Sequence, residues 1–234
     1  MKALILNSGL GSRMGKYTAA APKCMVPLDE QETIVARQLR LLAQAGISEV
    51  VMTTGPYEEL LREHIEELGL PIQITFVNNP KYRETNYIYS IYLAREILHD
   101  EIILMHGDLV FEESVLKQIV TLGKDCMAVS SMLELPEKDF KAVLKDDMIQ
   151  AVGIEFMENA VAAQPLYHFG KTAWEIWLRQ IEKFCEDGVV SCYAENALNQ
   201  VTNRLQLYPY DFGKRLCQEV DKEEDLLAVR ELLK

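Results

Sequence analysis

Residues 2–15 read KALILNSGLGSRMG, an apolar run that passes directly into a glycine-rich segment. The run from Lys2 to Asn7 has the length and composition of a strand that is buried on both faces, as strands of parallel sheets are. Glycines directly after such a strand let backbone N–H groups approach phosphate oxygens, because no Cβ stands in the way. In open α/β sheets, ligands bind at the carboxyl ends of the strands. This stretch therefore predicts an α/β fold with an anion-binding loop after its first strand.

Short apolar runs and helical patterns alternate from this strand to residue 122. The segment 33–45, for example, carries Val35, Leu39 and Leu42 on one helical face. The full set comprises strands over 2–7, 49–54, 72–77 and 101–105 and helices over 33–45, 57–68, 88–98 and 112–122. Crossovers of this length join parallel strands. We predict a Rossmann-like three-layer α/β/α fold with a mostly parallel, mixed central sheet.

The pattern changes after residue 125, where β-rich segments follow one another without long helices between them. Lys145-Asp-Asp-Met148 is typical of a hairpin turn, because aspartate suits tight turn positions. This half is predicted to contain strands over 126–133, 141–144, 148–156, 205–210 and 216–220 and helices over 171–187, 192–201 and 223–233. We expect a single domain over 1–234. Its first half covers about 1–125, its second half covers about 126–234 and contains a β-rich insertion, and the two halves share one sheet.

The net charge of −12 argues against nucleic-acid polymers and anionic membranes as partners, since both bind clustered Lys and Arg. Residues 1–28 nevertheless contain four basic residues and no Asp or Glu, while the rest of the chain carries 20 basic and 36 acidic residues. Either this segment holds a small anion, or the distribution is chance combined with a buried first strand.

The expected compartment follows from apolar runs and cysteines. No apolar run approaches the roughly 18 residues that span a bilayer, and the apolar start is too short for a signal-peptide core. The five cysteines are odd in number and form no CxxC pair, so neither a zinc site nor a disulfide framework is predicted. We expect a cytoplasmic protein.

The glycine segment fails two common phosphate-binding motifs. A Walker P-loop requires G-x4-G-K-[ST], but five residues separate Gly9 from Gly15, and Lys16 is followed by Tyr17. A dinucleotide-binding turn requires G-x-G-x-x-G, and Met14 stands where the third glycine belongs. The second predicted strand also ends without a carboxylate for a ribose. Both interpretations are rejected.

What remains is Gly9-Leu-Gly-Ser-Arg13, with Pro22-Lys23 ten residues on. This pattern resembles the N-terminal signature of the nucleotidyltransferase superfamily, which includes sugar-phosphate nucleotidyltransferases and the phosphocholine and phosphonate cytidylyltransferases. In that family the loop wraps a nucleoside triphosphate, whose oxygens the Arg and Lys contact. The segment 79–92 resembles the loop and helix start of the small choline-type and phosphonate-type cytidylyltransferases, which favours that branch.

The resemblance implies a role for each matching residue. Arg13 and Lys23 would be catalytic, stabilising charge on the triphosphate. Asp108 and Asp221 would hold Mg²⁺; each follows a predicted strand of one sheet, so both carboxylates are expected at its carboxyl edge. Glu195 would contact the acceptor, with a solvated helix carboxylate as the equal alternative. The implied nucleotide-binding set is Leu6, Asn7, Ser8, Gly9, Gly11, Ser12, Arg13, Lys23, Asn79, Thr85, Asn86 and Ser90.

Two of these assignments have structural alternatives. Asp221 and Glu224 match a capping box, which would make Asp221 the N-cap of the last helix. Thr85 or Asn86 would likewise cap the helix expected to begin at Ile88. The sequence alone leaves both alternatives open.

The resemblance implies transfer of CMP from CTP to a small phosphonate, 2-aminoethylphosphonate or 2-hydroxyethylphosphonate, with release of pyrophosphate. Such an acceptor is ionised near neutral pH, so catalysis would rest on positioning and charge neutralisation rather than on a general base. The alternatives are a phosphocholine cytidylyltransferase, a sugar-1-phosphate nucleotidyltransferase and a non-catalytic nucleotide-binding regulatory relative. No aromatic cluster that would cage a quaternary ammonium is evident from the sequence. The chain is compatible with a homodimer.

Overall fold

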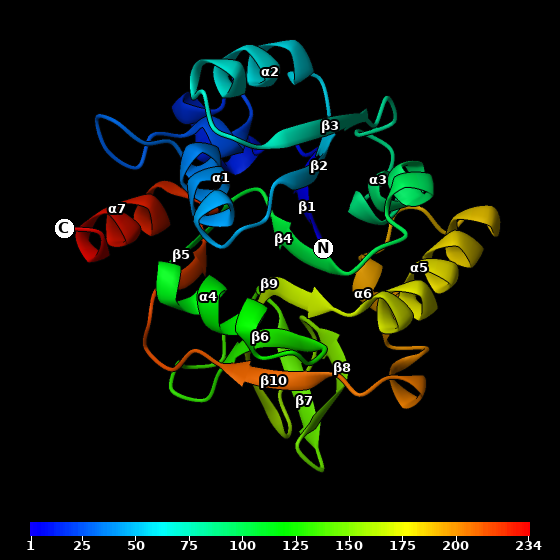
Figure 1. Ribbon diagram of the computed structural model, residues 1–234. Coiled ribbons are helices and arrows are strands. Elements are labelled where there is room, and N and C mark those ends of the chain that lie inside the picture. Colours follow the sequence, from blue (N-terminus) through cyan, green and yellow to red (C-terminus); the bar gives the residue numbers. More distant parts are fainter.

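The computed structural model describes residues 1–234, which form three layers with helices on both faces of a central sheet (Figure 1). The elements of the first half are β1 (Lys2–Asn7), η1 (Ser12–Tyr17), η2 (Lys23–Met25), α1 (Ile34–Gln44), β2 (Glu49–Thr54), α2 (Glu58–Glu67), β3 (Gln73–Asn78), α3 (Tyr87–Ala94), η3 (Arg95–Ile97), β4 (Ile102–His106), β5 (Leu109–Phe111) and α4 (Glu113–Thr121). The elements of the second half are β6 (Cys126–Ser130), β7 (Lys141–Lys145), β8 (Met148–Gly153), β9 (Ala160–Phe169), α5 (Lys171–Glu186), α6 (Ala194–Leu198), η4 (Thr202–Arg204), β10 (Tyr208–Asp211), β11 (Cys217–Glu219) and α7 (Glu223–Leu232).

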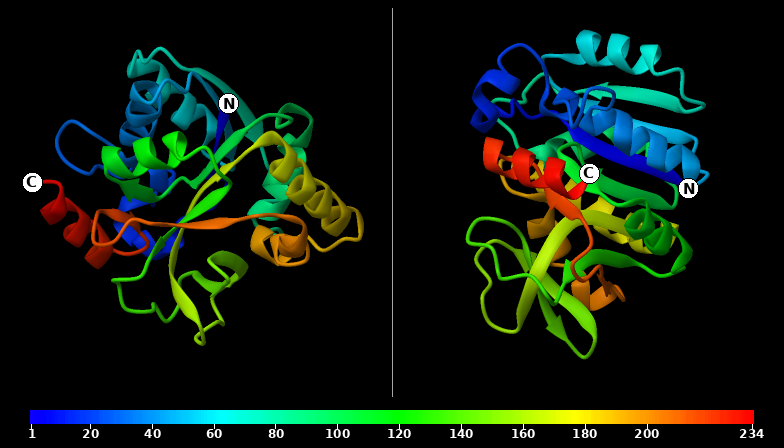
Figure 2. Two further views of the ribbon diagram at one scale, coloured as in Figure 1. Left: turned by 60° about the horizontal axis from the view of Figure 1, so that its bottom comes forward. Right: turned by 90° about the vertical axis from the view of Figure 1, so that its left-hand side faces the viewer.

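The central sheet has nine strands, seven of which follow in the order β10-β6-β9-β4-β1-β2-β3. The strands β1 to β4 are parallel to their neighbours among themselves, whereas β9 runs antiparallel between β4 and β6. The β7–β8 hairpin is attached to β9, and the views of Figure 2 show it, in green, at the far end of the molecule from β3. The predicted fold class, with its mixed sheet and its β-rich second half, is confirmed.

Alternate residues of β1 explain the three layers. Leu4 and Leu6 pack into a core with α3, α5 and α6, while Ala3 and Ile5 pack into a second core with α1, α2 and α4. Figure 1 shows α3, α5 and α6 grouped on one side and α1 and α4 on the other. Because both faces of the strand are buried, every position between its ends must be apolar, as the sequence indicated.

The strand β9 lies in the middle of the sheet and was not predicted. It contains Pro165, which lacks the N–H that a central strand normally donates. The pairing with β6 shifts register between Met127 and Val129, opposite the stretch that contains this proline. A local irregularity therefore accommodates a residue that argues against a strand when the sequence is examined alone.

The prediction that the strand before Asp221 belongs to the main sheet is wrong. That strand, β11, pairs antiparallel with β5 in a separate sheet of two strands. The strand itself was predicted, over 216–220, but its partner β5 was not, because three residues are too short for a period-2 pattern. β5 follows directly after the turn that carries Asp108, so this small sheet still brings the chain before Asp221 back to the end of β4.

The predicted hairpin turn at 145–148 is present. Asp146 and Asp147 have φ angles of 52° and 58°, and the pairing of Lys145 with Met148 closes a two-residue loop. Positive φ at both central positions gives the twist that adjoining strands require.

No helix of the structure combines the length and the apolar character of a segment that crosses a bilayer.

Candidate active site

A cleft of about 400 Å³ lies at the carboxyl ends of the parallel strands. The glycine loop after β1, the loop between β3 and α3 and the turn after β4 form its first half, and residues around Phe140, Tyr193 and Asp221 close it from the second half. All twelve residues predicted to bind nucleotide line this cleft, as do both predicted metal ligands, Asp108 and Asp221. Glu195 is the one predicted site residue that does not.

The glycine loop is held in shape by a small number of contacts. Gly11 has a φ of 61°, and a Cβ added there would lie 3.0 Å from the Cβ of Lys23. The Thr18 hydroxyl donates to the Gly11 carbonyl over 2.8 Å. A side chain at position 11 would therefore be strained and would displace Lys23, so glycine keeps the loop and the lysine close together.

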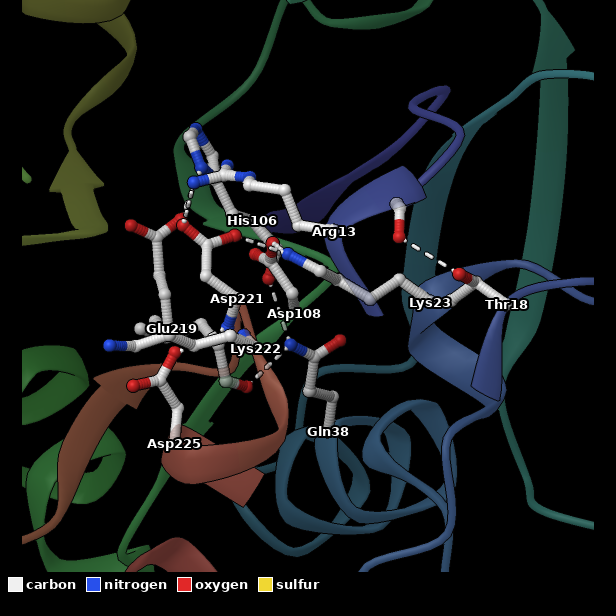
Figure 3. A network of polar contacts seen from close by, with 12 residues as sticks. Arg13, Thr18, Lys23, Gln38, His106, Asp108, Glu219, Asp221, Lys222 and Asp225 are labelled. Carbon is white, nitrogen blue, oxygen red and sulfur yellow. Dashed lines mark hydrogen bonds and ion pairs between the residues drawn. The ribbon is translucent and has the colours of Figure 1, made fainter. Parts of the chain in front are cut away.

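Lys23 and Arg13 reach from this loop to two carboxylates (Figure 3). The Lys23 Nζ lies 2.6 Å from Asp108 Oδ2 and 2.5 Å from Asp221 Oδ1, and the Arg13 Nη1 lies 2.8 Å from Asp221 Oδ2. Burial opposes the charge on Lys23, but Asp108 and Asp221 outweigh it and raise the pKa of the amine. Burial likewise opposes ionisation of Asp108, but Lys23 and then His106 lower the pKa of that carboxyl. Both partners are therefore charged in the folded protein.

The turn that carries Asp108 is fixed from helix α1. The buried Gln38 amide donates to the carbonyls of His106 and Leu109 over 2.9 and 2.8 Å, one on each side of the turn. The backbone N–H of Val220 in turn donates to the Asp108 carbonyl over 3.0 Å. These bonds fasten the chain that precedes Asp221 to the chain at Asp108.

The capping alternative for Asp221 is not what the structure contains. The N-cap of α7 is Lys222, and the Asp225 carboxylate accepts from the N–H groups of Lys222 and Asp221, both over 3.0 Å. The carboxylate of Asp221 is therefore not used as a cap and faces the cleft. Asn86, by contrast, is the N-cap of α3 while it also lines the cleft.

The residues present fit a hard divalent cation. Asp108 and Asp221 converge closely enough to share one ammonium group, and Mg²⁺ prefers one or two carboxylates together with phosphate oxygens and water. Ligand atoms of His106, Asp108 and Glu219 also lie within 4.8 Å of one another. His106 and Glu219 are paired with each other, however, since 2.8 Å separates His106 Nδ1 from Glu219 Oε1. The predicted pair, Asp108 and Asp221, therefore remains the candidate for holding such an ion.

The loop between β3 and α3 has its own polar network. The buried Asn79 amide donates to Thr85 Oγ1 and to Ser90 Oγ, each over 3.0 Å, and its carbonyl oxygen accepts from the Lys81 N–H over 2.9 Å. These predicted nucleotide-binding residues therefore also support one another. On the opposite wall, Gly107 leaves room for the Asn7 side chain, because a Cβ there would lie 1.5 Å from Asn7 Oδ1.

Four aromatic rings meet at the second-half end of the cleft. Ring centroids lie 4.7 Å apart for Tyr87 and His106, 5.9 Å for Tyr87 and Tyr193, 5.3 Å for Phe140 and Tyr193, and 6.4 Å for His106 and Phe140. Glu219 lies beside His106, and burial together with Asp108 raises its pKa to about 7. We call these four rings the aromatic pocket; sequence reasoning missed it, because its members come from four separate segments.

Glu195 lies behind the aromatic pocket rather than in it. It is 1% exposed and accepts hydrogen bonds from the hydroxyls of Tyr87 and Tyr167, the latter over 2.8 Å. Burial and then Glu195 raise the pKa values of both tyrosines well above their usual value. Since Tyr87 lines the cleft and Tyr167 lies in the core, Glu195 connects the two.

The basic glycine loop at the end of β1 faces two convergent aspartates, as the resemblance to nucleotidyltransferases implies. Comparison with known proteins agrees, since residues 3–150 match the MobA-like NTP transferase domain. The chain belongs to this family of NTP transferases.

Individual relatives are similar to this chain to different extents. The CMP-5'-(3-aminopropyl)phosphonate synthase of Streptomyces rubellomurinus is 37% identical over 119 residues, which span 51% of this chain and 19% of that longer protein. The choline-phosphate cytidylyltransferase of Streptococcus pneumoniae is 23% identical over 100% of this chain and 99% of its own length. Among solved structures, a CTP:phosphocholine cytidylyltransferase from Streptococcus pneumoniae superposes with a TM-score of 0.81 at 22% identity, covering 100% of this chain and 99% of its own.

Proposed function

We propose that this NTP transferase moves CMP from CTP to 2-aminoethylphosphonate, or to a close phosphonate relative, and releases pyrophosphate. The observation that carries the proposal is that one cleft contains both the aromatic pocket and the glycine loop that we expect to bind a triphosphate. The rings line the same cleft as Asp108 and Asp221, where an acceptor would have to lie.

The chemistry of the pocket favours an acceptor with a cationic end. The faces of Tyr and Phe rings, here Tyr87, Phe140 and Tyr193, attract ammonium groups. Such contacts contribute about 0.5 to 1 kcal/mol at exposed sites and about 2 kcal/mol when water is excluded. The carboxyl groups of Glu219 and Asp139 also line the cleft. An acceptor with a neutral hydroxyethyl end would gain less from these groups than one with an aminoethyl end.

The relatives support the same substrate class. The names of the Streptomyces and Streptococcus proteins refer to an aminopropylphosphonate and to phosphocholine, which both join an amine or ammonium to a phosphorus acid by a short carbon chain. Both names also refer to CMP or cytidylyl groups. We propose that this chain shares the two features that these names have in common, which are CTP as the donor and a short acceptor that bears an amine or ammonium group.

In the proposed reaction, an oxygen of the acceptor phosphonate attacks the α-phosphorus of CTP. One P–O bond forms as the bond to pyrophosphate breaks, and pyrophosphate leaves with the electron pair. The acceptor is already ionised, so no side chain has to remove a proton. Arg13 and Lys23 would bind triphosphate oxygens and stabilise the charge that grows on the leaving group. Mg²⁺, held by Asp108 and Asp221, would neutralise phosphate charge when bound.

Phosphocholine is the second candidate acceptor. It is favoured by the full-length similarity to the Streptococcus enzyme and by the ring faces, which suit a quaternary ammonium as well as a primary one. A sugar 1-phosphate fits less well, because it has no cationic group for the ring faces and the carboxyl groups to attract.

A pyrophosphate-release assay that crosses CTP, UTP, ATP and dTTP with four acceptors tests the proposal. We expect CTP with 2-aminoethylphosphonate to give the highest kcat/KM, ahead of phosphocholine, 2-hydroxyethylphosphonate and a sugar 1-phosphate. Tyr193→Leu should lower kcat/KM for the two cationic acceptors by about 2- to 30-fold and leave the hydroxyethyl acceptor nearly unchanged. Equal or faster turnover with another nucleotide, or preference for the sugar phosphate, would contradict the proposal.

A further inference from the structure

Lys23 occupies the space between the two carboxylates that would bind a metal ion. Its Nζ contacts Asp108 Oδ2 at 2.6 Å and Asp221 Oδ1 at 2.5 Å, and the three side chains are only 12%, 19% and 21% exposed. Ammonium and Mg²⁺ compete for the same oxygens, because both require close contact with negatively charged ligands. In this arrangement the cation site is filled by the protein itself.

Arg13 completes the balance of charge. Its Nη1 takes the second oxygen of Asp221 at 2.8 Å, so two basic groups face two carboxylates. A free divalent cation would have to displace Lys23 and would leave an ammonium with little exposure and no partner. Losing the partner of a poorly solvated charge is costly, so the displacement is unfavourable while no anion is present to receive the lysine.

A bound triphosphate changes this balance. Lys23 and Arg13 line the same cleft as the glycine loop that would wrap the phosphates, so phosphate oxygens bound there would offer both side chains new anionic partners. The two carboxylates are then free for a cation, which the phosphates also attract.

We propose that Lys23 closes the metal site of the free protein and that the nucleotide opens it by drawing the lysine to its phosphates. The inference rests on the proposed roles of Asp108 and Asp221 and is independent of the acceptor. Lys23 thus has two positions, one on the carboxylates and one on the triphosphate. Metal and nucleotide therefore bind together, and the divalent ion binds weakly alone.

The test measures Mn²⁺ binding by electron paramagnetic resonance of the free ion, without acceptor. Without nucleotide, Lys23→Met should bind Mn²⁺ about 10- to 100-fold more tightly than the wild type, within the usual range of coupling between sites. The control is Lys16→Met in the same loop, whose lysine is 70% exposed and pairs with Glu223, and it should behave as the wild type. Lys23→Gln serves as a second variant, and circular dichroism checks that each variant is folded.

Two further arms decide the outcome. In the wild type, α,β-methylene-CTP, which cannot transfer CMP, should raise Mn²⁺ affinity, and in Lys23→Met the nucleotide should raise it much less. Asp108→Asn in the Lys23→Met background should abolish the gained affinity, which locates the ion. Equal Mn²⁺ affinity of wild type and both Lys23 variants would overturn the proposal, whereas a failure to transfer CMP to any acceptor would contradict only the proposed function.

Discussion

Glu195→Gln separates two roles that this residue could have. The buried carboxylate accepts from the hydroxyls of Tyr87 and Tyr167, and glutamine offers a single acceptor oxygen in the same space. A hydrogen bond to a charged group contributes about 1.5 to 3 kcal/mol, so the variant should lose about 2 kcal/mol of unfolding free energy. For a chain of this size, that corresponds to a fall of about 4 to 8 °C in Tm.

The two tyrosines provide matched controls for the effect on activity. Tyr87→Phe and Tyr167→Phe each remove one bond to Glu195, but only Tyr87 lines the cleft. Both should lower Tm in calorimetry by similar amounts, whereas Tyr87→Phe and Glu195→Gln should also raise the acceptor KM in the pyrophosphate assay. Glu195 would then be a positioning residue that orients Tyr87, and aminoethyl and hydroxyethyl acceptors should be affected by similar factors. An unchanged Tm for Glu195→Gln, with a loss confined to cationic acceptors, would refute this reasoning and return Glu195 to direct contact.

Three other predictions concern the charged residues of the cleft. Lys23→Ala should lower kcat by about 10² to 10³ with a smaller effect on KM, because the amine meets charge that grows in the transition state; a change in KM alone would make Lys23 a binding residue only. Asp108→Asn and Asp221→Asn should each reduce activity by orders of magnitude in the folded protein, and the double variant should be little worse, since two ligands of one ion act as a unit. Burial opposes ionisation of Asp108, but Lys23 and His106 lower the pKa of its carboxyl in the folded protein. The stability that the ionised carboxylate contributes is therefore present above the unfolded pKa of 3.8 and is lost as the pH falls through the lower folded pKa. Tm should fall more steeply on acidification in the wild type than in Asp108→Asn.

Much of the fold follows from local patterns. The strands β1 and β4 are apolar between their ends because both of their faces are buried. The boundaries of β1, β2 and β4 agree with prediction to within a residue. β9 could not be predicted, because Pro165 contradicts a central strand until the register shift beside it is known. The three-residue strand β5 carries no periodic pattern, so the sequence could not show that the predicted strand over 216–220 pairs with it.

The candidate site was predictable only where a motif marked it. The glycine loop, Lys23 and Asp108 have spacings that can be compared with a family, and the cleft contains all of them. The aromatic pocket has no such signal, because Tyr87, His106, Phe140 and Tyr193 meet only once the two halves of the chain are folded together. Glu195 was predicted by its resemblance to an acidic helical segment, which says nothing about the tyrosines that cover it.

The formation of a phosphonate–CMP anhydride tests the central proposal most directly. Phosphorus-31 NMR of CTP, 2-aminoethylphosphonate, Mg²⁺ and the protein should show the phosphonate resonance and the α-phosphorus resonance replaced by two mutually coupled signals, with one pyrophosphate for each anhydride formed. Asp108→Asn should give no product under the same conditions. Pyrophosphate release that leaves the phosphonate resonance unchanged, as simple hydrolysis of CTP would produce, contradicts the account.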